Sequence, residues 1–469
     1  MVSKMTVKKP HIVILGAGIS GLTLAWSLKQ RLGTNIHISI LEKENRSGGY
    51  MHTHHQDGFL FEYGPRSCRP SGAGLETLKL IESLQLQNDI ITENVEAKKR
   101  YLWKDQTLHP LPNGFFSFLT SPLTKKTIWP IAREFLRPKT KVADESIFSF
   151  FNRRFSPEIA ETLIDPLVNG IYAGDIRKLS IRSCFPLFHE MEQTYGSLVK
   201  GFLLSPKKSY SLSDFQSKMQ KTSLFSFRKG IETLPKELSK HLTAELKLNH
   251  TVTALNFDHD AIRIQLNDKR SLEANYLFST LPSHALVKLT DHAPFIEQLT
   301  SIPHVPIAVV NLGWHQPILK QQGFGFLIPS REKEKILGIV WDSSVFPTQN
   351  AIPNQTRLTV MIGGALFCPH HFATLDASQF IALACKAVEK HLDIFQPPDT
   401  CAVKIIPQAI PQYLVGHHEK VKMIQQIAAN IHPHFQVLGS SFFGVSVNDC
   451  IKKSVDVADY FHKNANKKS

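Results

Sequence analysis

The stretch HIVILGAGISG, residues 11–21, decides the fold of this chain. Its apolar first half predicts a buried strand that runs directly into Gly16-x-Gly18-x-x-Gly21, and we expect a helix over residues 20–32. Gly16 permits a tight turn, Gly18 lets backbone N–H groups approach a pyrophosphate, and Gly21 lets the helix pack on the sheet. The pattern therefore predicts a dinucleotide cradle at the positive N-terminus of a helix.

An acidic residue follows this motif at the expected distance. Glu42 ends the next apolar strand, residues 36–41, and lies 21 residues beyond Gly21. A carboxylate in this place accepts hydrogen bonds from a ribose hydroxyl. The predicted cradle also includes Ile19 and Ser20 in the first turn of the helix, and Lys43 beside the acid. An ordinary glycine-rich turn is therefore the weaker interpretation.

A second glycine pair comes just after the acid, at Gly48 and Gly49, preceded by Arg46. Glycines here let the chain pass close to a flat group, although the pair taken alone also fits the start of a hairpin. Together with Glu42 these residues resemble the signature of the flavoprotein superfamily that contains amine oxidases, phytoene desaturases and protoporphyrinogen oxidases. Members of that superfamily hold FAD, so the resemblance implies FAD as the cofactor.

Composition limits the class of protein and its partners. The chain has 469 residues, 42% of them hydrophobic, which suffices for two or three cores. A net charge of +14 suggests an acidic partner: a nucleic acid, an anionic membrane face or a carboxylate-bearing substrate. The basic residues do not form one block interleaved with aromatics, so we predict no nucleic-acid partner.

Neither cysteine nor histidine spacing predicts a metal site. The six cysteines contain no CxxC pair, which is typical of a reducing compartment and argues against zinc or iron–sulfur binding. His52 and His54 would share one face of a strand and could in principle bind a metal. No acid or cysteine nearby completes a ligand set, so we interpret them as surface histidines on a hairpin that turns at Asp57-Gly58.

The N-terminal region imitates a secretory signal, because Lys4, Lys8 and Lys9 precede an apolar stretch over residues 12–26. The glycine register explains that stretch better as part of the nucleotide fold. No run reaches the ~18 apolar residues of a spanning helix. We expect a cytoplasmic protein, with a peripheral position on the inner face of the cell membrane left open.

The remaining chain predicts an α/β protein with an insertion. Residues 73–84 read as a helix, the pattern from about Tyr101 to Lys208 is mainly helical, and residues 245–255 read as one strand. A strand at residues 436–439 precedes a last glycine-to-helix junction. We expect a Rossmann-type, glutathione-reductase-like FAD domain built from residues 1–95, 211–290 and 426–469. Residues 96–210 would form a helical insert that could bind membranes. Residues 291–425 would form a mixed-sheet substrate domain.

The insert combines aromatic and basic residues. Aromatics occur within residues 111–119 and at Trp129, and the cations beside them are Lys125, Lys126, Arg133, Arg137, Lys139 and Lys141. Apolar anchors beside a basic cluster suit a protein lying on a membrane surface. A helical core with a solvated basic face is the alternative, and the sequence does not separate the two.

Over nearly its whole length the chain resembles the oxygen-dependent, FAD-containing protoporphyrinogen oxidases. The segments that carry this resemblance are residues 61–66, 69–72, 169–175, 179–186, 322–325, 338–343 and 444–450. They are far more specific than the shared nucleotide motif.

The resemblance implies a set of site residues. FAD contacts carry over to Gly16, Gly18, Ile19, Ser20, Gly21, Glu42, Lys43, Arg46, Gly48, Gly49, Gly64, Pro65, Arg66, Val252, Ser440, Val445, Ser446 and Val447. Ser440 stands where a smaller alanine is common in the family. The substrate pocket carries over to Arg100, Tyr101, Gly170, Phe324, Gly325, Leu327 and Met361.

Two arginines are the implied catalytic residues. Arg100 would anchor a propionate, although its place after Lys98 and Lys99 also fits a solvent-facing cation. Arg66 would lie near the flavin and tune its charge, and a purely structural role at the Gly-Pro turn remains open. No Ser/His/Asp or Cys/His constellation stands out, which fits a reaction without a protein nucleophile.

The resemblance implies the oxidation of protoporphyrinogen IX to protoporphyrin IX, with six electrons removed in three two-electron steps, molecular oxygen as acceptor, and a homodimer. Oxidation of coproporphyrinogen III in the same pocket is one alternative. A flavin amine oxidase is another, although the aromatic cage and flavin-facing lysine it needs cannot be placed. A non-enzymatic escort protein on the same fold is a third alternative. Such proteins tend to lose the glycines and the acid that contact the flavin nucleotide, whereas this chain keeps them.

Overall fold

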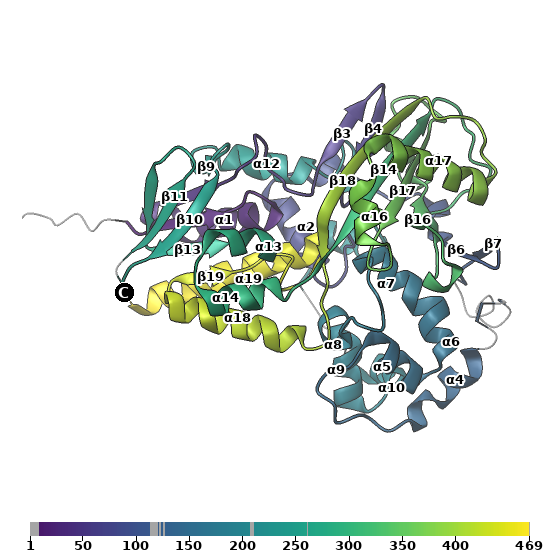
Figure 1. The fold of residues 1–469 in the computed structure, drawn as a ribbon, viewed down its shortest axis with the longest axis horizontal. Coiled ribbons are helices and arrows are strands. Elements are labelled where there is room, and N and C mark those ends of the chain that lie inside the picture. The colour runs from purple at the N-terminus through teal and green to yellow at the C-terminus, as the bar shows by residue number, and fades with distance from the viewer. Residues whose placement is uncertain are drawn as a thin grey trace, which may run out of the picture.

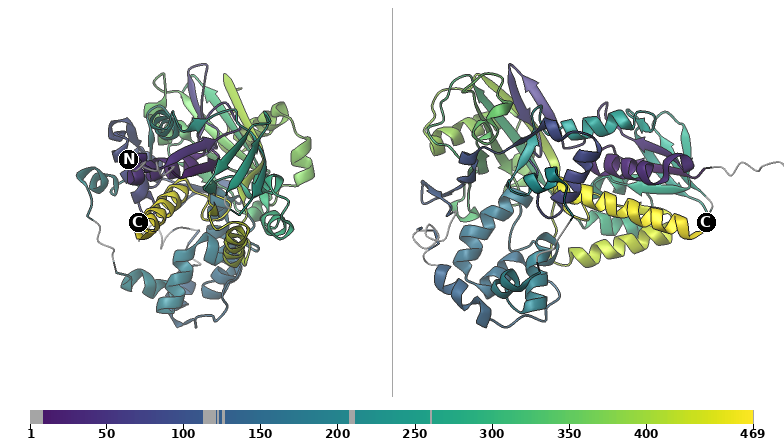
Figure 2. Two further views of the ribbon diagram at one scale, coloured as in Figure 1. Left: turned by 90° about the vertical axis from the view of Figure 1, so that its left-hand side faces the viewer. Right: turned by 180° about the vertical axis from the view of Figure 1, so that it is seen from behind.

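The computed structural model describes residues 9–112, 121, 123–124, 127–206, 211–259 and 261–468. Figure 1 shows a layered nucleotide-binding part at one end, a large twisted sheet at the other, and a helical lobe beside both. The first and last helices, α1 (Ile19–Leu32) and α19 (Val447–Lys468), lie side by side in all views (Figures 1 and 2). The two ends of the chain therefore build the same layer.

A five-stranded parallel sheet with the order β19-β13-β1-β2-β9 forms the nucleotide-binding part. Its strands are β1 (His11–Leu15), β2 (His37–Leu41), β9 (Leu246–Lys247), β13 (Tyr276–Ser279) and β19 (Phe435–Val437). Ile12 and Ile14 of β1 face a core shared with α1, α19, α2 (Gly74–Ser83) and α12 (Thr233–His241). This arrangement confirms the Rossmann-type fold predicted from the first motif.

The other face of this sheet is covered by a small antiparallel sheet and three helices. Val13 and Leu15 pack there on β10 (Val252–Phe257), β11 (Ile262–Leu266), β12 (Ser271–Ala274), α13 (Ser283–Leu286), α14 (Ala293–Thr300) and α18 (His417–Ile431). The single strand predicted over residues 245–255 is wrong. Asn249 has φ = 60°, and the turn it makes sends β9 and β10 into different sheets.

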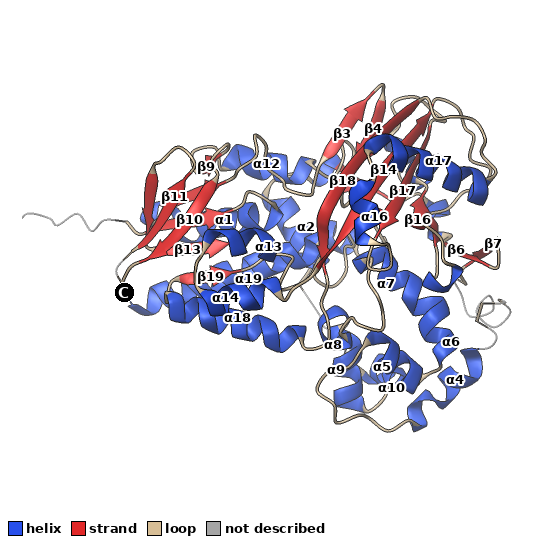
Figure 3. Ribbon diagram, viewed as in Figure 1, coloured by secondary structure: helices blue, strands red, loops and turns tan. Residues whose placement is uncertain are grey.

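A mixed seven-stranded sheet with the order β18-β14-β17-β16-β15-β6-β7 forms the opposite end (Figure 3). Its strands are β6 (Tyr101–Lys104), β7 (Thr107–Pro110), β14 (His304–Trp314), β15 (Gly325–Leu327), β16 (Ile336–Val340), β17 (Thr356–Gly363) and β18 (Thr400–Pro411). The mainly helical pattern predicted from Tyr101 is wrong at its start. Residues 101–110 form a hairpin instead, because Tyr101 and Leu102 pair with β15 and complete this sheet.

The two faces of the mixed sheet have different neighbours. Its outer face carries Ala308, Val310 and Leu312 into a core closed by α17 (Ala377–Leu392). On the inner face, Gly313 and Ala402 contact the hairpin of β3 (Thr53–Gln56) and β4 (Phe59–Glu62), and Val309 packs near α7 (Asp165–Tyr172). The inner face is therefore the one turned toward the nucleotide-binding part.

The helical lobe has its own core around Phe150, Phe151 and Val168. Its remaining helices are α4 (Ile128–Arg133), α5 (Ile147–Arg154), α6 (Pro157–Ile159), α8 (Ile181–Cys184), α9 (Pro186–Tyr195) and α10 (Leu198–Leu204). Arg154 is fully buried and forms ion pairs with the equally buried Glu134 and Glu192. Charged groups in such a place need this mutual pairing to offset their lost hydration.

Short elements connect these parts. They are β5 (Ile90–Thr92), β8 (Phe225–Phe227), α11 (Asp214–Met219), α15 (Asp342–Val345), α16 (Pro369–Thr374) and several single helical turns. In the described part of the chain, no helix is both long enough and apolar enough to cross a bilayer.

Candidate functional site: a dinucleotide cradle facing the mixed sheet

The turn between β1 and α1 is built for close approach. Gly16 has φ = 93°, which favours glycine, and a Cβ on Gly21 would lie 2.0 Å from the carbonyl oxygen of Gly16. By contrast, a Cβ on Gly18 would meet no protein atom within 4 Å. Gly18 is the N-cap of α1, so Ile19 and Ser20 present N–H groups toward this open space at the positive end of the helix.

Glu42 lies directly after β2 and braces the same turn. Its Oε2 accepts a hydrogen bond from the Ala17 N–H at 2.8 Å, and its Oε1 accepts one from the Glu44 N–H at 3.0 Å. An ionised carboxylate has further lone pairs, so it can also accept a hydrogen bond from a ribose hydroxyl. Lys43 beside it is exposed and forms an ion pair with Glu44 at 3.5 Å.

The second glycine pair lies against the first motif. The Gly48 N–H donates to the Ala17 carbonyl at 2.8 Å, and a Cβ on Gly49 would lie 3.2 Å from the Cα of Gly18. Arg46 holds this loop, because its guanidinium donates to the carbonyls of Ser47 and Gly49 and pairs with Glu232 at 3.2 Å. The two glycine motifs, separate in the sequence, therefore form one surface of backbone.

The strand that follows brings a third glycine to this surface. A Cβ on Gly64 would lie 2.2 Å from the carbonyl oxygen of Tyr50, so only glycine fits there. After Pro65, the Arg66 guanidinium forms an ion pair with Asp342 at 2.8 Å, and both side chains are only 13% exposed. Thr359 donates to the other oxygen of Asp342 at 2.7 Å. Arg66 therefore carries a nearly neutralised charge in this structure.

The turn that broke the predicted strand also serves the site. The Asn249 N–H donates to the carbonyl of Glu44 at 3.1 Å, and the His250 N–H donates to that of Glu42 at 2.8 Å. These bonds hold the turn that precedes Val252, the first residue of β10, against the segment of Glu42. The structure thus gives a local reason for including Val252 among the predicted FAD contacts.

The end of the chain closes the cradle. Thr280 Oγ1 donates to the Leu15 carbonyl at 2.8 Å, and a Cβ on Gly439 would lie 3.0 Å from the Thr280 carbonyl oxygen. The Tyr413 hydroxyl donates to the carbonyl of Ser440 and accepts a hydrogen bond from the Gly444 N–H at 2.8 Å. These contacts fix the segment that leads through Val445 to α19.

The N-terminus of α19 has its own side-chain hydrogen bonds. The Asp449 N–H donates to Ser446 Oγ at 3.1 Å, and Ser446 Oγ donates to Asp449 Oδ2 at 2.6 Å. Deeper in the helix, Ser454 Oγ donates to the Ser20 carbonyl at 2.9 Å. The last of these contacts ties α19 to the first turn of α1.

These segments fit a dinucleotide. They offer backbone N–H groups, an open space at Gly18 and a carboxylate at Glu42. Because the residues around them are glycines, no side chain covers this surface. The residues that would hold FAD are therefore those of the two glycine motifs, Glu42, and the segments around Gly64, Val252 and Ser440.

A buried carboxyl beneath the cradle was not predicted. Glu62 accepts hydrogen bonds from the Ile231 N–H at 2.7 Å and from Thr53 Oγ1 at 2.9 Å. Burial raises the pKa of Glu62 to about 8, although these hydrogen bonds and Arg66 oppose the shift. The signals in the sequence are an acid inside an apolar strand, between Phe61 and Tyr63, and its place in a segment that carries the family resemblance. Asp342 was missed as well, although it lies in a segment that carries the family resemblance.

Three predicted substrate residues share the inner face of the mixed sheet. Leu327 pairs with Gly338, Gly338 pairs with Met361, and Met361 pairs with Val309, so their side chains form one row. Directly paired residues lie on the same face of a sheet. Gly325 pairs with Val340 and points the same way.

Gly170 closes over this row from α7. A Cβ on Gly170 would lie 3.1 Å from the Leu327 side chain, so the absence of a side chain lets α7 approach the sheet. The structure therefore brings Gly170 of α7 and Met361 of β17 to the strand that carries Gly325 and Leu327.

Arg100 directly precedes β6 of the same sheet. Its guanidinium lies 5.1 Å from the centre of the Phe324 ring, a cation–π contact that joins two predicted residues. Burial, followed by the nearby cation of Arg69, lowers the pKa of Arg100, while Glu93 opposes the shift. Arg100 is thus a partly desolvated cation rather than the solvent-facing residue that the sequence left open, and Arg69 is a second cation that was not predicted.

Tyr101 is not brought to this face. It pairs with Phe326, its ring lies 5.3 Å from that of Trp341, and both neighbours belong to the outer core. Adjacent residues along an extended chain point to opposite faces, so the outward position of Tyr101 turns Arg100, directly before it, toward the inner face.

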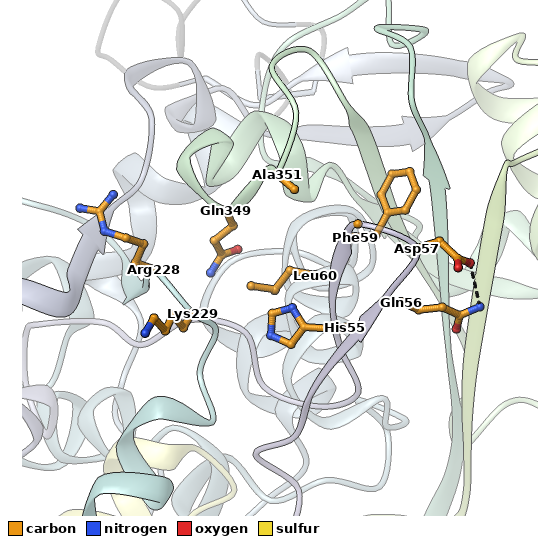
Figure 4. A pocket seen from close by; sticks show the side chains of 10 residues that line it. His55, Gln56, Asp57, Phe59, Leu60, Arg228, Lys229, Gln349 and Ala351 are labelled. Atoms are coloured by element: carbon orange, nitrogen blue, oxygen red, sulfur yellow. Dashed lines mark hydrogen bonds between the residues drawn. The ribbon is translucent and has the colours of Figure 1, made fainter.

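Two cavities lie outside the predicted set. A cavity of about 590 Å³ lies where β14, β17 and β18 end, and its lining includes His304, Gly364 and Gln412. A shallower one, of about 350 Å³, lies beside the β3–β4 hairpin, where His55, Leu60 and Gln349 line it together with Arg228 and Lys229 (Figure 4). None of the residues predicted to bind cofactor or substrate lines either cavity.

Known proteins resemble this chain over almost its full length. Residues 19–460 match the family of flavin-containing amine oxidoreductases. The protoporphyrinogen oxidases of Bos taurus and Homo sapiens are 36% and 35% identical over 465 and 471 residues, with 95% of this chain and 97% of each relative covered. A coproporphyrinogen III oxidase of Bacillus subtilis is 29% identical over 469 residues, with the same coverage.

Solved structures share the fold. A crystal structure from Exiguobacterium, provisionally named a protoporphyrinogen oxidase, aligns with a TM-score of 0.80 at 23% identity and covers 97% of this chain and 99% of its own. Cyclohexylamine oxidase from Brevibacterium oxydans aligns with a TM-score of 0.71 at 12% identity, covering 98% and 100%. Together with the cradle, these findings show that the chain is an FAD-dependent oxidoreductase and belongs to the family of flavin-containing amine oxidoreductases, among relatives that include the protoporphyrinogen oxidases.

Proposed function

We propose that this enzyme oxidises protoporphyrinogen IX to protoporphyrin IX, a step of heme biosynthesis. The observation that carries the proposal is the inner face of the mixed sheet. This face carries the apolar row of Leu327 and Met361, and a partly buried cation, Arg100, directly precedes strand β6 of the same sheet. The proposal also rests on the 35–36% identity to relatives named for this reaction.

The substrate has a large apolar ring with two propionates, and the residues present match both parts. Arg100 can form a bidentate, charge-assisted pair with one carboxylate, which fixes the orientation of the ring. Leu327, Met361 and the face of α7 at Gly170 exclude water from the ring and hold it against the sheet. FAD bound in the cradle supplies the two-electron acceptor for each of the three oxidation steps.

Arg66 has a narrower role in this proposal than the sequence suggested. Its ion pair with Asp342 cancels most of its charge, so it positions the segment after Gly64 more than it adds a positive field. Asp342 is held in turn by Thr359 on the inner face. The pair therefore ties the cradle to the substrate sheet.

Coproporphyrinogen III is the main alternative, since relatives at 29% and 26% identity are named for its oxidation. That substrate carries four propionates and would benefit from Arg69 as a second cation near Arg100. Porphyrin fluorescence measured with each porphyrinogen separates the two. We expect the higher kcat/KM with protoporphyrinogen, and a clear preference for coproporphyrinogen would overturn the proposal. If the protein oxidised an amine and formed porphyrin from neither porphyrinogen, the result would instead favour an amine oxidase.

Oxygen as acceptor and a homodimer are further parts of this proposal, and both rest on the family resemblance. Oxygen consumption that keeps pace with porphyrin formation would support the first. A mass of two chains in light scattering would support the second.

We also propose that the helical lobe binds an anionic bilayer surface. Its described surface exposes Trp129, Leu136, Leu187, Phe202, Leu203 and Leu204, which are 56–78% accessible. The exposed cations Arg133, Arg137, Lys139 and Lys141 belong to the same lobe, and the Arg133 guanidinium lies 4.5 Å from the centre of the Trp129 ring. Lys125, Lys126 and the predicted aromatic stretch from residue 113 lie outside the described residues. Apolar side chains next to cations suit the headgroup region of anionic lipid.

Vesicle sedimentation tests this surface. Phe202→Ser combined with Leu203→Ser should weaken binding to phosphatidylglycerol vesicles several-fold, while activity in detergent is unchanged. Phe395→Ser is the matched control, because Phe395 is 72% exposed but lies outside the lobe. Equal binding of both variants would contradict the assignment.

A further inference from the structure

Two cysteines from different elements meet on the outer side of the mixed sheet. Cys385 lies in the middle of α17, and Cys401 is the second residue of the edge strand β18. Both pack against the core that α17 forms with the sheet, and both are half-buried. Cys401 alternates with Val403 and Ile405 toward that core, so its side chain points at the helix. α17 packs directly on β18, and the two thiols share a hydrogen bond across this contact.

This contact gives the pair a reactivity that the buried cysteines lack. The hydrogen bond with Cys401 lowers the pKa of Cys385 to about 7, because the neighbouring thiol stabilises the Cys385 thiolate. The same bond raises the pKa of Cys401, which keeps its proton. In contrast, burial raises the pKa of Cys68 to about 12 and that of Cys450 to about 11.

We propose that Cys385 and Cys401 are a peroxide-oxidised thiol pair, whose disulfide ties α17 to β18. The Cys385 thiolate attacks one oxygen of hydrogen peroxide, the O–O bond breaks, and a sulfenic acid and water result after proton transfer. The Cys401 sulfur then attacks the sulfenic sulfur, the S–S bond forms, and the second water leaves. Two thiols are oxidised and one peroxide is reduced to two waters.

The position of the pair suggests what the disulfide does. It lies in the outer core and not on the inner face that carries Met361, so its formation leaves the proposed substrate face unchanged. The disulfide protects Cys385 from irreversible oxidation and fastens the helix that covers the sheet. Peroxide from the enzyme's own turnover is a source only if the proposed oxygen-dependent reaction holds, and the chemistry of the pair does not require that source.

Intact-mass spectrometry of the reduced full-length protein, treated with hydrogen peroxide, tests the pair. We expect the protein to lose the mass of two hydrogens and to yield one proteolytic fragment in which Cys385 and Cys401 are joined. Cys385→Ser should abolish this loss, and Cys401→Ser should leave a sulfenic acid on Cys385 that dimedone traps. Cys368→Ser is the matched control, because Cys368 is exposed, and it should keep the disulfide.

The outcomes distinguish this inference from the proposed function. An unchanged mass in the treated native protein, or the same loss of hydrogens in Cys385→Ser, would overturn the pair. In a second arm, turnover of protoporphyrinogen replaces the added peroxide, with catalase as a control. A disulfide formed with added peroxide but not during turnover would support the pair and count against oxygen as the acceptor.

Discussion

The cofactor cradle and the substrate face are built in different ways. The cradle is made mostly of backbone, and its surface depends on glycines such as Gly16, Gly21 and Gly64, whose neighbours leave no room for a Cβ. The proposed substrate face is made of side chains from separate strands, aligned only by sheet register, as Leu327 and Met361 are. One region is determined by short motifs, and the other by the pairing of a whole sheet.

This difference separates the expected effects of substitutions. A change in the cradle should affect folding or flavin content, because the same backbone both holds the fold together and contacts the flavin nucleotide. A change on the substrate face should affect KM while leaving the flavin bound. Breaking the ion pair between Arg66 and Asp342, which joins the two regions, should lower the free energy of unfolding while leaving both regions formed.

The largest effect should come from two neighbouring glycines that differ in their surroundings. Gly21→Ala places a Cβ 2.0 Å from the Gly16 carbonyl oxygen, so we expect little folded protein. Gly18→Ala meets no protein atom within 4 Å and should fold normally, but its methyl group fills space next to the N-terminus of α1 and should weaken FAD binding. Circular dichroism and visible flavin absorbance measure the two properties separately. Equal folding and equal flavin content in both variants would refute the backbone description of the cradle.

The link between the regions should give the next largest effect. Arg66→Ala leaves Asp342 largely buried without its cation, and we expect a loss of about 3 kcal/mol of unfolding free energy. Denaturant unfolding of the flavin-loaded protein measures this loss. The control is Asp459→Asn, which breaks the more exposed pair with Arg31 and should cost less than about 1 kcal/mol. If the two variants lost the same unfolding free energy, the Arg66–Asp342 pair would contribute no more than an exposed ion pair to holding the two regions together.

On the substrate face, Arg100→Ala should raise KM for protoporphyrinogen about 10-fold to 100-fold, the value of one charge-assisted hydrogen bond. Flavin content should not change, because Arg100 lies outside the cradle. Steady-state kinetics with Lys98→Ala as the control tests this, since Lys98 is exposed two residues away. A similar KM in the two variants would show that Arg100 does not bind the substrate and acts as an ordinary solvent-facing cation.

Glu62 should give an effect that is small over any one pH unit and is visible only as pH dependence. Its pKa is about 8 in the folded protein and near 4.5 when unfolded, so the folded state binds more protons between these values. Stability from this group is therefore full below about pH 4.5 and is lost as pH rises through about 8, with a slope of at most about 1.4 kcal/mol per pH unit. Thermal unfolding of Glu62→Gln should show a flatter pH profile over this range. An unchanged profile would place the carboxyl in contact with water.

The sequence predicted the cradle well because its signals are local. The glycine spacing, the strand before it and Glu42 lie within 32 residues, and each has one structural meaning. The substrate residues came from family resemblance, since no local pattern could show that Gly170 contacts Leu327.

The misses have long-range causes. Residues 101–110 have no strong strand pattern, and they become strands only because they pair with β15. The turn at Asn249 is fixed by hydrogen bonds to Glu42 and Glu44, about 200 residues earlier in the chain. Likewise, neither Asp342 nor Glu62 could be assigned a partner before the sheet and the cradle were placed together.

The most direct test of the account is an anaerobic mixing experiment with the purified, flavin-containing protein and protoporphyrinogen IX. The account predicts that the visible absorbance of the bound flavin bleaches while porphyrin fluorescence appears, and that Arg100→Ala slows bleaching at low substrate concentration only. A fully loaded enzyme whose flavin stays oxidised in the presence of protoporphyrinogen would contradict it.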